Sequence, residues 1–283
     1  MTRSFIAAAA ALMLTHTGAL AAGGDIKIPR NEWSFSGLFG QYDKAQLQRG
    51  FQVYREVCAS CHGIERLSFR NLVQSGGPEF PAEDVKALAA EYEVDDLPNE
   101  DGEIVKRPAK LSDKFPPLYA NEQEARSIHN GALPPDLSVI AKARGTAYIG
   151  PWYLHPYAML KDIVSGYQEG GSDYLTALLK GYKEPPADME MSDGMYYNAY
   201  YPGHQIAMAN PFAGGDGQVE YQNAETPATV AQYSKDVTAF LSWAADPTLN
   251  QRKQIGWQVM LYLLITAILL YIAKRRIWTN VKH

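Results

Sequence analysis

Apolar residues recur at helical spacing in a segment near the start of the chain. Between positions 43 and 57, every third or fourth residue is large and apolar: Leu47, Phe51, Tyr54 and Val57. This spacing predicts a helix with one buried face, and Asp43 can cap its N-terminus. Gly50 costs that helix roughly 1 kcal/mol relative to a good helix former. We therefore expect another helix to approach closely at Gly50.

A segment with the same pattern, Thr229 to Ala245, is the expected partner. Its apolar positions again step by three or four: Val230, Tyr233, Val237, Leu241 and Ala244. Pro227 and Thr229 are start signals, and Asp246-Pro247 ends the pattern. Two such segments predict terminal helices that cross in the core of one domain.

Between these helices, the pattern predicts short helices joined by long loops. They are expected over residues 83–92, 122–129, 137–142 and 172–179. No repeat and no sustained alternation typical of strands is present. The segment Thr146 to Gly171 is rich in Tyr, Pro and Gly, and we predict no element or function for it. The expected fold class is all-α, with long loops.

The first residues have the pattern of a secretory signal peptide. Arg3 precedes an apolar run from Phe5 to Leu14, and Ala19-Leu20-Ala21 matches a cleavage site of small residues. A membrane anchor is the alternative, but the apolar run is short and polar residues follow it. We expect residues 1–21 to be removed and residues 22–250 to form an exported domain.

A second apolar run lies near the C-terminus. Ile255 to Ala273 contains no charged residue, and as a helix it would be about 28 Å long, enough to cross the hydrocarbon core of a bilayer. A buried core helix is the alternative. The cluster Lys274-Arg275-Arg276 follows and favours a cytoplasmic C-terminus. Residues 251–283 are therefore expected to form a transmembrane anchor and a short cytoplasmic tail.

Composition and charge agree with one exported domain plus additions at its ends. The chain has 283 residues, of which 46% are hydrophobic and 20% charged, with a net charge of −5. Several cations lie in the signal peptide or at the membrane span, so the exported part is more acidic than the whole chain. Its acids cluster between Glu91 and Glu103, and again in Asp188, Glu190 and Asp193. Such faces are either simply solvated or attract a basic partner; no nucleic-acid partner is expected.

The strongest chemical motif is Cys58-Ala59-Ser60-Cys61-His62, which contains the only two cysteines of the chain. C-x-x-C-H is the pattern of covalent c-type haem attachment, in which both cysteines form thioethers and the histidine binds iron. A helical turn would place both sulfurs on one face. One haem c, attached through Cys58 and Cys61 with His62 as an axial ligand, is therefore predicted.

Two other interpretations of the cysteine pair are weaker. A thioredoxin-like redox pair would follow a strand in a βαβ unit, whereas here the preceding residues have a helical pattern. A structural zinc site would need two more Cys or His ligands at compact spacing, and the chain has no second cysteine pair.

The iron needs either a sixth ligand or an open site. Met208 lies in Ile206-Ala207-Met208-Ala209, where small residues would let its sulfur approach a porphyrin closely. The other methionines of the exported part are Met159, Met189, Met191 and Met195, of which the last three lie among acidic residues. A methionine ligand raises the reduction potential relative to two histidines; the histidine alternatives are His129, His155 and His204.

Several motifs along the chain resemble those of the cytochrome c1 family. They are Arg49-Gly50-Phe51 running into Cys58 to His62, then Asn130-Gly131-Ala132-Leu133-Pro134-Pro135-Asp136-Leu137-Ser138, then Ile206-Ala207-Met208-Ala209, then Thr226-Pro227-Ala228-Thr229, and a terminal anchor. The resemblance implies that Met208 is the axial methionine and that Arg144 faces a haem propionate. It also implies that Pro135 and Tyr174 line the haem pocket.

The resemblance further implies a function and partners. Members of this family are the haem-bearing subunit of the quinol–cytochrome c reductase, the cytochrome bc complex. The implied partners are cytochrome b, the Rieske iron–sulfur protein, a soluble cytochrome c and membrane lipid. The implied location is the bacterial inner membrane, with the haem domain in the periplasm. The protein would carry one electron at a time and would make or break no bond of its own.

Two departures from the family pattern stand out. Thr146 to Gly171 resembles an insertion relative to shorter members, and the extra disulfide of some members is impossible here. A membrane-tethered haem enzyme or gas sensor with an open sixth site is the alternative function. A tethered thiol–disulfide oxidoreductase is a third.

Overall fold

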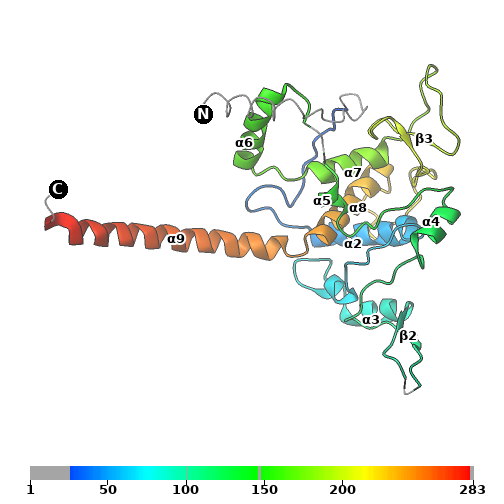
Figure 1. The fold of residues 1–283 in the computed structure, drawn as a ribbon, viewed down its shortest axis with the longest axis horizontal. Coiled ribbons are helices and arrows are strands. Elements are labelled where there is room, and N and C mark those ends of the chain that lie inside the picture. The colour runs from blue at the N-terminus through cyan, green and yellow to red at the C-terminus, as the bar shows by residue number, and fades with distance from the viewer. Residues whose placement is uncertain (1–25, 100, 146–147, 281–283) are drawn as a thin grey trace, which may run out of the picture.

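The computed structural model describes residues 26–99, 101–145 and 148–280, except for the side chain of Asn280. The predicted signal peptide lies outside these residues. Figure 1 shows a helical domain from which one long helix, α9, projects. The domain is mostly helical, as the sequence predicted.

The two predicted terminal helices form and cross. Helix α2 (Lys44–Val53) begins at Asp43, whose side chain accepts a hydrogen bond from the backbone N–H of Gln46 at 2.6 Å. Helix α8 (Val230–Ala245) begins at Thr229, whose hydroxyl accepts one from the backbone N–H of Gln232 at 3.3 Å. These caps satisfy N–H groups that have no partner inside the helix.

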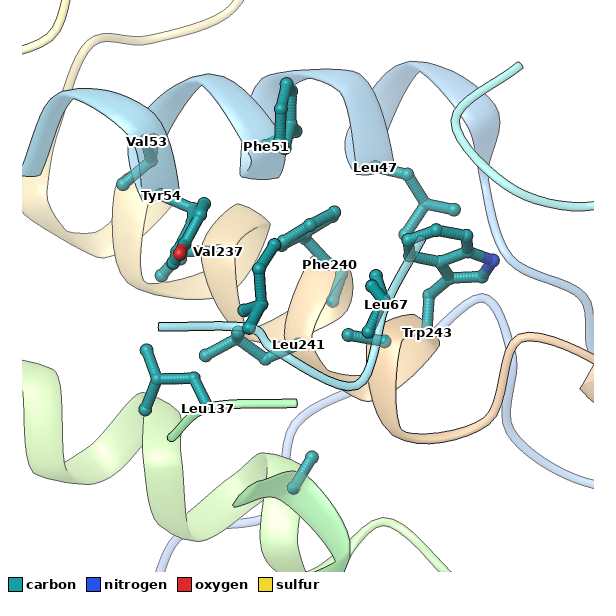
Figure 2. Close-up of a cluster of buried hydrophobic side chains, with 14 of the residues drawn as sticks. Leu47, Phe51, Val53, Tyr54, Leu67, Leu137, Val237, Phe240, Leu241 and Trp243 are labelled. Carbon is teal, nitrogen blue, oxygen red and sulfur yellow. The ribbon is translucent and has the colours of Figure 1, made fainter. Parts of the chain in front are cut away.

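The core lies between α2 and α8. Figure 2 shows side chains of α2 and of the turn after it facing side chains of α8, with Leu67 and Leu137 closing the cluster. Leu47, Val53, Val237, Phe240 and Trp243 are essentially inaccessible to solvent. Most of each stripe predicted from helical spacing is therefore buried; Val57, the last position of the first stripe, and Val230, the first position of the second, are half-buried.

The other predicted helices form with shifted ends. They are α3 (Ala82–Ala90), α4 (Glu122–Ile128), α5 (Ile140–Ala143) and α7 (Gly170–Lys180). A 3₁₀ turn that was not predicted, η2 (Phe69–Val73), precedes α3. Helix α5 begins three residues later than predicted, because the Asp136 carboxylate accepts a hydrogen bond from the backbone N–H of Ser138 at 2.8 Å and holds a turn there.

Two short antiparallel hairpins accompany the helices. Strand β1 (Glu93–Asp95) pairs with β2 (Lys106–Pro108), and β3 (Tyr196–Tyr197) pairs with β4 (Gln205–Ile206). Strands of two or three residues cannot produce sustained alternation in the sequence, which explains why the pattern did not reveal them.

The segment for which no element was predicted contains a helix. Residues 152–154 form a 3₁₀ turn, η3 (Trp152–Leu154), and α6 (His155–Ser165) follows it. Pro156 lies in the first turn, and Gly166 ends the helix with a left-handed φ of 68°. Both are ordinary helix boundary signals.

Helix α9 (Leu249–Ile277) contains the predicted span. Among residues 26–99, 101–145 and 148–280, it is the one helix long and apolar enough to cross a membrane. Its apolar side chains are exposed from Ile255 onward, so it is not the buried core helix that was the alternative. Trp278–Asn280 continue it as a 3₁₀ turn, η4.

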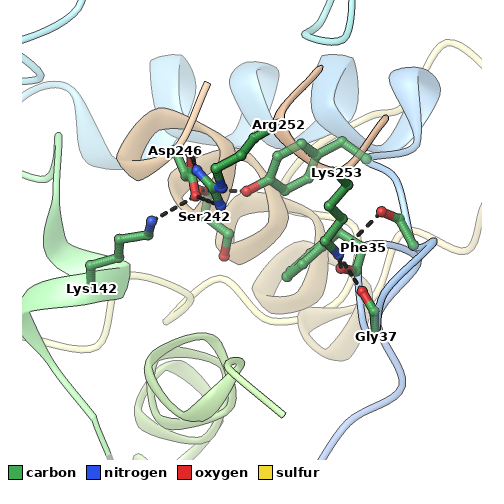
Figure 3. Close-up of polar contacts among 9 residues, drawn as sticks. Phe35, Gly37, Lys142, Ser242, Asp246, Arg252 and Lys253 are labelled. Carbon is green, nitrogen blue, oxygen red and sulfur yellow. Dashed lines mark hydrogen bonds and ion pairs between the residues drawn. The ribbon is translucent and has the colours of Figure 1, made fainter. Parts of the chain in front are cut away.

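Hydrogen bonds and ion pairs connect the first turns of α9 to the domain (Figure 3). The Lys253 ammonium donates hydrogen bonds to the carbonyl oxygens of Phe35, Gly37 and Gly40, at 2.6, 2.6 and 3.2 Å. The Asp246 carboxylate accepts bonds from Arg252 at 2.7 and 2.8 Å and from Lys142 at 2.6 Å. The expected domain boundary at residue 250 thus falls inside α9, and residues just beyond it still contact the domain.

Candidate functional site

The C-x-x-C-H motif lies where α2 ends. The helix widens over η1 (Tyr54–Cys58), where the Ala59 N–H bonds to the Tyr54 carbonyl oxygen, five residues back, at 2.8 Å. A tight turn follows, because the N–H groups of Cys61 and His62 both bond to the Cys58 carbonyl, at 3.1 and 2.9 Å. Wide helical turns of this kind occur often at functional sites. Both thiols are free and half-buried.

The environment of Cys58 argues against a redox-active thiol pair. Burial, and then the neighbouring Cys61, raise the pKa of the Cys58 thiol to about 12. A dithiol oxidoreductase needs the opposite, since the attacking thiol must ionise near neutral pH. Cys58 is therefore poorly suited to be the attacking thiol of such an enzyme.

His62 is held by the backbone of Pro135. The ring atom Nδ1 lies 2.8 Å from the Pro135 carbonyl oxygen. A carbonyl can only accept a hydrogen bond, so Nδ1 carries the proton and Nε2 keeps its lone pair. Burial lowers the pKa of His62, and the bond to Pro135 opposes this shift. A neutral ring with a free Nε2 and an oriented Nδ1–H is the form in which histidine binds a metal.

The backbone around the motif is fixed by two tyrosines. Tyr54 donates from its hydroxyl to the His62 carbonyl at 2.9 Å. Tyr119 donates to the Cys61 carbonyl at 3.3 Å, and its hydroxyl lies 2.7 Å from Nε2 of His129. Sequence reasoning did not single out Tyr119, because no local pattern signals a contact between residues 58 positions apart.

The second half of the Asn130–Ser138 motif packs against the residues after His62. The N–H of Leu137 bonds to the Gly63 carbonyl at 2.8 Å, and the Asp136 carboxylate accepts from the N–H of Glu65 at 2.8 Å. These contacts place Pro135 beside His62. The pocket-wall role of Pro135 stays a prediction; what the structure shows is that its carbonyl oxygen contacts His62 Nδ1.

Met208 lies in the loop after β4. Its side chain is half-buried, and its carbonyl accepts a hydrogen bond from the Tyr182 hydroxyl at 3.0 Å. Ile206 and Phe212 on either side are buried and anchor the loop. Of the histidines considered as alternatives, His204 has Nδ1 3.2 Å from the Asn198 carbonyl, and His155 lies on α6 next to the Tyr148 ring.

Arg144 and Tyr174 lie near one another. Burial raises the pKa of Tyr174, Tyr201 adds to the shift, and the positive charge of Arg144 opposes it. Arg144 caps the C-terminus of α5 and is exposed. Within the described ranges, its guanidinium has no hydrogen bond or ion pair, so it is available to an anionic group.

The residues present fit a c-type haem. One group consists of two free thiols and a histidine with a free Nε2; a second consists of Met208, Tyr182, Tyr174 and Arg144. No hydrogen bond joins the two groups in residues 26–99, 101–145 and 148–280. These same residues contain no cluster of three His, Cys, Asp or Glu side chains that could hold a metal ion, so the further ligands that structural zinc requires are not gathered there.

Comparison with known proteins gives a consistent result. Residues 33–281 match the model of the cytochrome c1 family. A protein of Blastochloris viridis named cytochrome c1 is 50% identical over 266 residues, which cover 93% of this chain and 90% of the relative. A protein of Schizosaccharomyces pombe named "Cytochrome c1, heme protein, mitochondrial" is 42% identical over 254 residues, which cover 90% of this chain and 73% of the relative.

A longer relative also matches. The Bradyrhizobium diazoefficiens protein named cytochrome b/c1 is 45% identical over 278 residues, which cover 98% of this chain but only 39% of that relative. The haem named for the S. pombe relative agrees with the cofactor predicted from Cys58, Cys61 and His62. The motif, the helical fold and the extent of these matches lead to one conclusion. This chain belongs to the cytochrome c1 family.

Proposed function

We propose that this protein is a membrane-anchored one-electron carrier that holds one haem c. Cys58 and Cys61 would form the thioether links, and His62 and Met208 would bind the iron. The observation that carries the proposal is the hydrogen bond between His62 Nδ1 and the Pro135 carbonyl at 2.8 Å, because it leaves Nε2 free one residue after the second thiol.

The protein's own residues orient the groups that would hold the haem. A bound haem with histidine and methionine ligands supplies a one-electron couple. The Pro135 carbonyl fixes the tautomer and the ring plane of His62. Tyr182 holds the loop that carries Met208, and the exposed guanidinium of Arg144 would pair with a propionate, for which its planar donor geometry is suited.

The proposed partners come from the family. The name of the Bradyrhizobium relative, cytochrome b/c1, supports assembly of this chain with a cytochrome b in the quinol–cytochrome c reductase. Within that complex, the protein would accept electrons from the Rieske iron–sulfur protein and reduce a soluble cytochrome c. No proton transfer or bond cleavage is assigned to this chain.

The proposed topology places the haem domain, residues 22–250, in the periplasm of a bacterial inner membrane. Helix α9 would cross the bilayer over residues 255–273, and Lys274, Arg275 and Arg276 in its last turn favour a cytoplasmic C-terminus. Residues 1–21 would be removed as a signal peptide.

A pyridine haemochrome spectrum and a potentiometric titration of the full-length protein test the proposal. We expect the spectrum of a haem with two thioether links and a single one-electron transition. The reduced protein should not bind carbon monoxide, because Met208 occupies the sixth site. Binding of carbon monoxide would instead support a haem enzyme or gas sensor, and a spectrum without haem would refute the assignment altogether.

A further inference from the structure

Helix α6 turns its apolar face away from the protein. At about 100° per residue, its large apolar residues fall on one side: Pro156, Tyr157, Met159, Leu160, Ile163 and Val164. Ile163 is 73% exposed and Val164 is 80% exposed. A surface helix of a soluble domain normally points such a stripe at the core. In α6 the apolar side instead faces away from the core.

The opposite, small and polar side of α6 faces the domain. Ala158 and Asp162 are its half-buried side chains, and Asp162 accepts a hydrogen bond from Arg30 at 3.1 Å. Arg30 also stacks on the Tyr167 ring at 3.8 Å from its centre, and Tyr167 donates to the Asp173 carboxylate of α7 at 2.7 Å. These contacts fix the orientation of α6, so the exposed stripe is not the result of a loose helix.

Helix α6 lies beside the point where α9 leaves the domain. A Cβ at Gly166, the residue that ends α6, would lie 3.5 Å from the Gly37 Cα, and the Gly37 carbonyl accepts a hydrogen bond from Lys253. Lys253 is two residues before Ile255, where the uncharged run begins. In Figure 1, α6 lies at the end of the domain from which α9 emerges and runs across the direction of α9.

Other exposed apolar residues gather at the same end. The turn before α6 exposes Trp152 at 84%, and the loop held by Lys253 exposes Leu38 and Phe39 at 77% and 76%. Trp and Tyr are enriched at the boundary between lipid and water. Lys161 borders the apolar stripe and can extend its ammonium toward lipid headgroups.

We propose that α6 is an interfacial helix that lies flat in the headgroup region of the bilayer that α9 crosses, with its apolar face toward the acyl chains. The inference rests on the membrane anchoring in the proposed function. A helix of this kind inserts its apolar face by about 5–10 Å. Lipid is the favoured occupant because α6 ends beside the loop that is bound by Lys253, which lies two residues before the span begins, and because the stripe combines aromatic and aliphatic residues with few charges.

Cysteine substitutions labelled with an environment-sensitive fluorophore test the location of α6. Ile163→Cys reports the apolar face, and Ser165→Cys, on the opposite side of the same helix turn, is the matched control. Leu263→Cys in α9 is the positive control for the span. Each full-length, haem-loaded variant is measured in vesicles of phosphatidylcholine and phosphatidylglycerol and in the assembled membrane complex, with the unsubstituted chain giving the labelling background.

We expect nitroxide lipids labelled near the headgroup to quench the probe at position 163 severalfold more than the probe at position 165. Iodide in the aqueous phase should show the reverse order. Equal behaviour at the two positions, with Leu263→Cys still quenched by lipid, would overturn the inference and leave the anchor standing. Lipid quenching at 163 that is lost in the assembled complex would also overturn it, since a protein partner would then cover the face.

Loss of lipid quenching at position 263 as well would refute the membrane anchor and the interfacial helix together. The haem absorption band of the same samples reports the haem assignment separately. Failure of the interfacial helix, of the anchor and of the haem site can therefore be distinguished.

Discussion

Gly50 of α2 lies directly against the backbone of Asp236 in α8. A Cβ at Gly50 would overlap the carbonyl oxygen of Asp236 and would lie 2.7 Å from the Phe240 Cβ. The close approach that the sequence indicated at Gly50 is therefore the crossing of the two terminal helices, and the cost of a glycine inside α2 is offset by packing that no other residue allows.

Gly50→Ala should destabilise the haem domain. The added methyl group must separate two packed helices, and overpacking of this kind costs about 1–3 kcal/mol. Chemical denaturation followed by the haem absorption band measures the effect. Gly145→Ala is the matched control, because nothing lies within 4 Å of a Cβ at that position. Equal stability of the two variants would contradict this account of the crossing.

The sequence predicted the helices and the local motif well for a physical reason. The signals for α2, for α8 and for the haem motif depend only on residues that are close together in the sequence. They are the periodic apolar positions of the two helices and the spacing of Cys58, Cys61 and His62. The contact between His62 and the Pro135 carbonyl was not predictable, because it joins residues 73 positions apart and uses a backbone atom that every residue has.

Helix α6 shows a different limit. No helix was predicted here, although the sequence contains its start and stop signals, Pro156 and Gly166, and apolar residues at helical spacing. The direction in which that stripe points depends on Arg30, Tyr167 and Asp173, which no local pattern connects to it. Sequence periodicity can predict a helix face without saying whether protein or lipid covers it.

The contacts at the base of α9 predict where the soluble domain can be cut. Truncation after Asn250 should yield a soluble, haem-loaded domain, and truncation after Gln254 should yield a more stable one. The longer chain keeps the Lys253 bonds to three carbonyls and the Arg252 bonds to the Asp246 carboxylate; a hydrogen bond from a charged donor contributes about 1.5–3 kcal/mol. Thermal unfolding of the two domains measures the difference, and identical midpoints would mean that these bonds add nothing.

Asp246 should make the contacts between the start of α9 and the haem domain sensitive to acid. Burial alone would raise the pKa of this carboxyl, but hydrogen bonds from Arg252 and Lys142 outweigh burial and lower the pKa below its usual value. A lowered pKa in the folded state contributes stability that is present above the ordinary Asp pKa of about 3.9 and is lost as the pH falls through the folded value. The loss should therefore set in below about pH 5.

The stability of the chain truncated after Gln254 can be measured as a function of pH. Asp246→Asn should reduce its stability at neutral pH and flatten the decline in acid. Asp162→Asn, at the more exposed pair with Arg30, is the control and should leave the acid profile nearly unchanged. A wild-type acid slope in the Asp246 variant would show that this carboxylate does not set the profile.

Met208→Leu should retain covalent haem and lower its reduction potential. The substitution removes a sulfur that favours ferrous iron, and we expect a shift well above about 59 mV, which corresponds to a tenfold change in a one-electron equilibrium. The reduced variant should also bind carbon monoxide. Met195→Leu, at an exposed methionine, should change neither property. His62→Ala should be more damaging, because the haem would lose the ligand next to its attachment site.

The acids between residues 91 and 103 should steer the soluble electron acceptor. The β1–β2 hairpin projects from the domain on the side away from α9 (Figure 1). Two acids between residues 91 and 103 are already paired: Glu91, at the end of α3, with Arg55 at 3.1 Å, and Asp96 of the hairpin with Arg107 at 3.2 Å. Asp95, Asp101 and Glu103 are exposed and have no ion pair among the described residues, so their charge is free to act on a partner.

Neutralising these three acids as Asp95→Asn, Asp101→Asn and Glu103→Gln should slow reduction of a basic cytochrome c about tenfold, the lower end of electrostatic steering effects. It should also flatten the salt dependence, because the wild-type rate falls as the Debye length shrinks from about 10 Å at 0.1 M salt to about 3 Å at 1 M. The haem potential should stay nearly the same. A second triple variant, Asp188→Asn, Glu190→Gln and Asp193→Asn, is the control in stopped-flow measurements, because it removes three negative charges from a different surface. If both triple variants slow the reaction equally, net charge rather than the hairpin attracts the acceptor; if only the control slows it, the acceptor docks near residues 188–193.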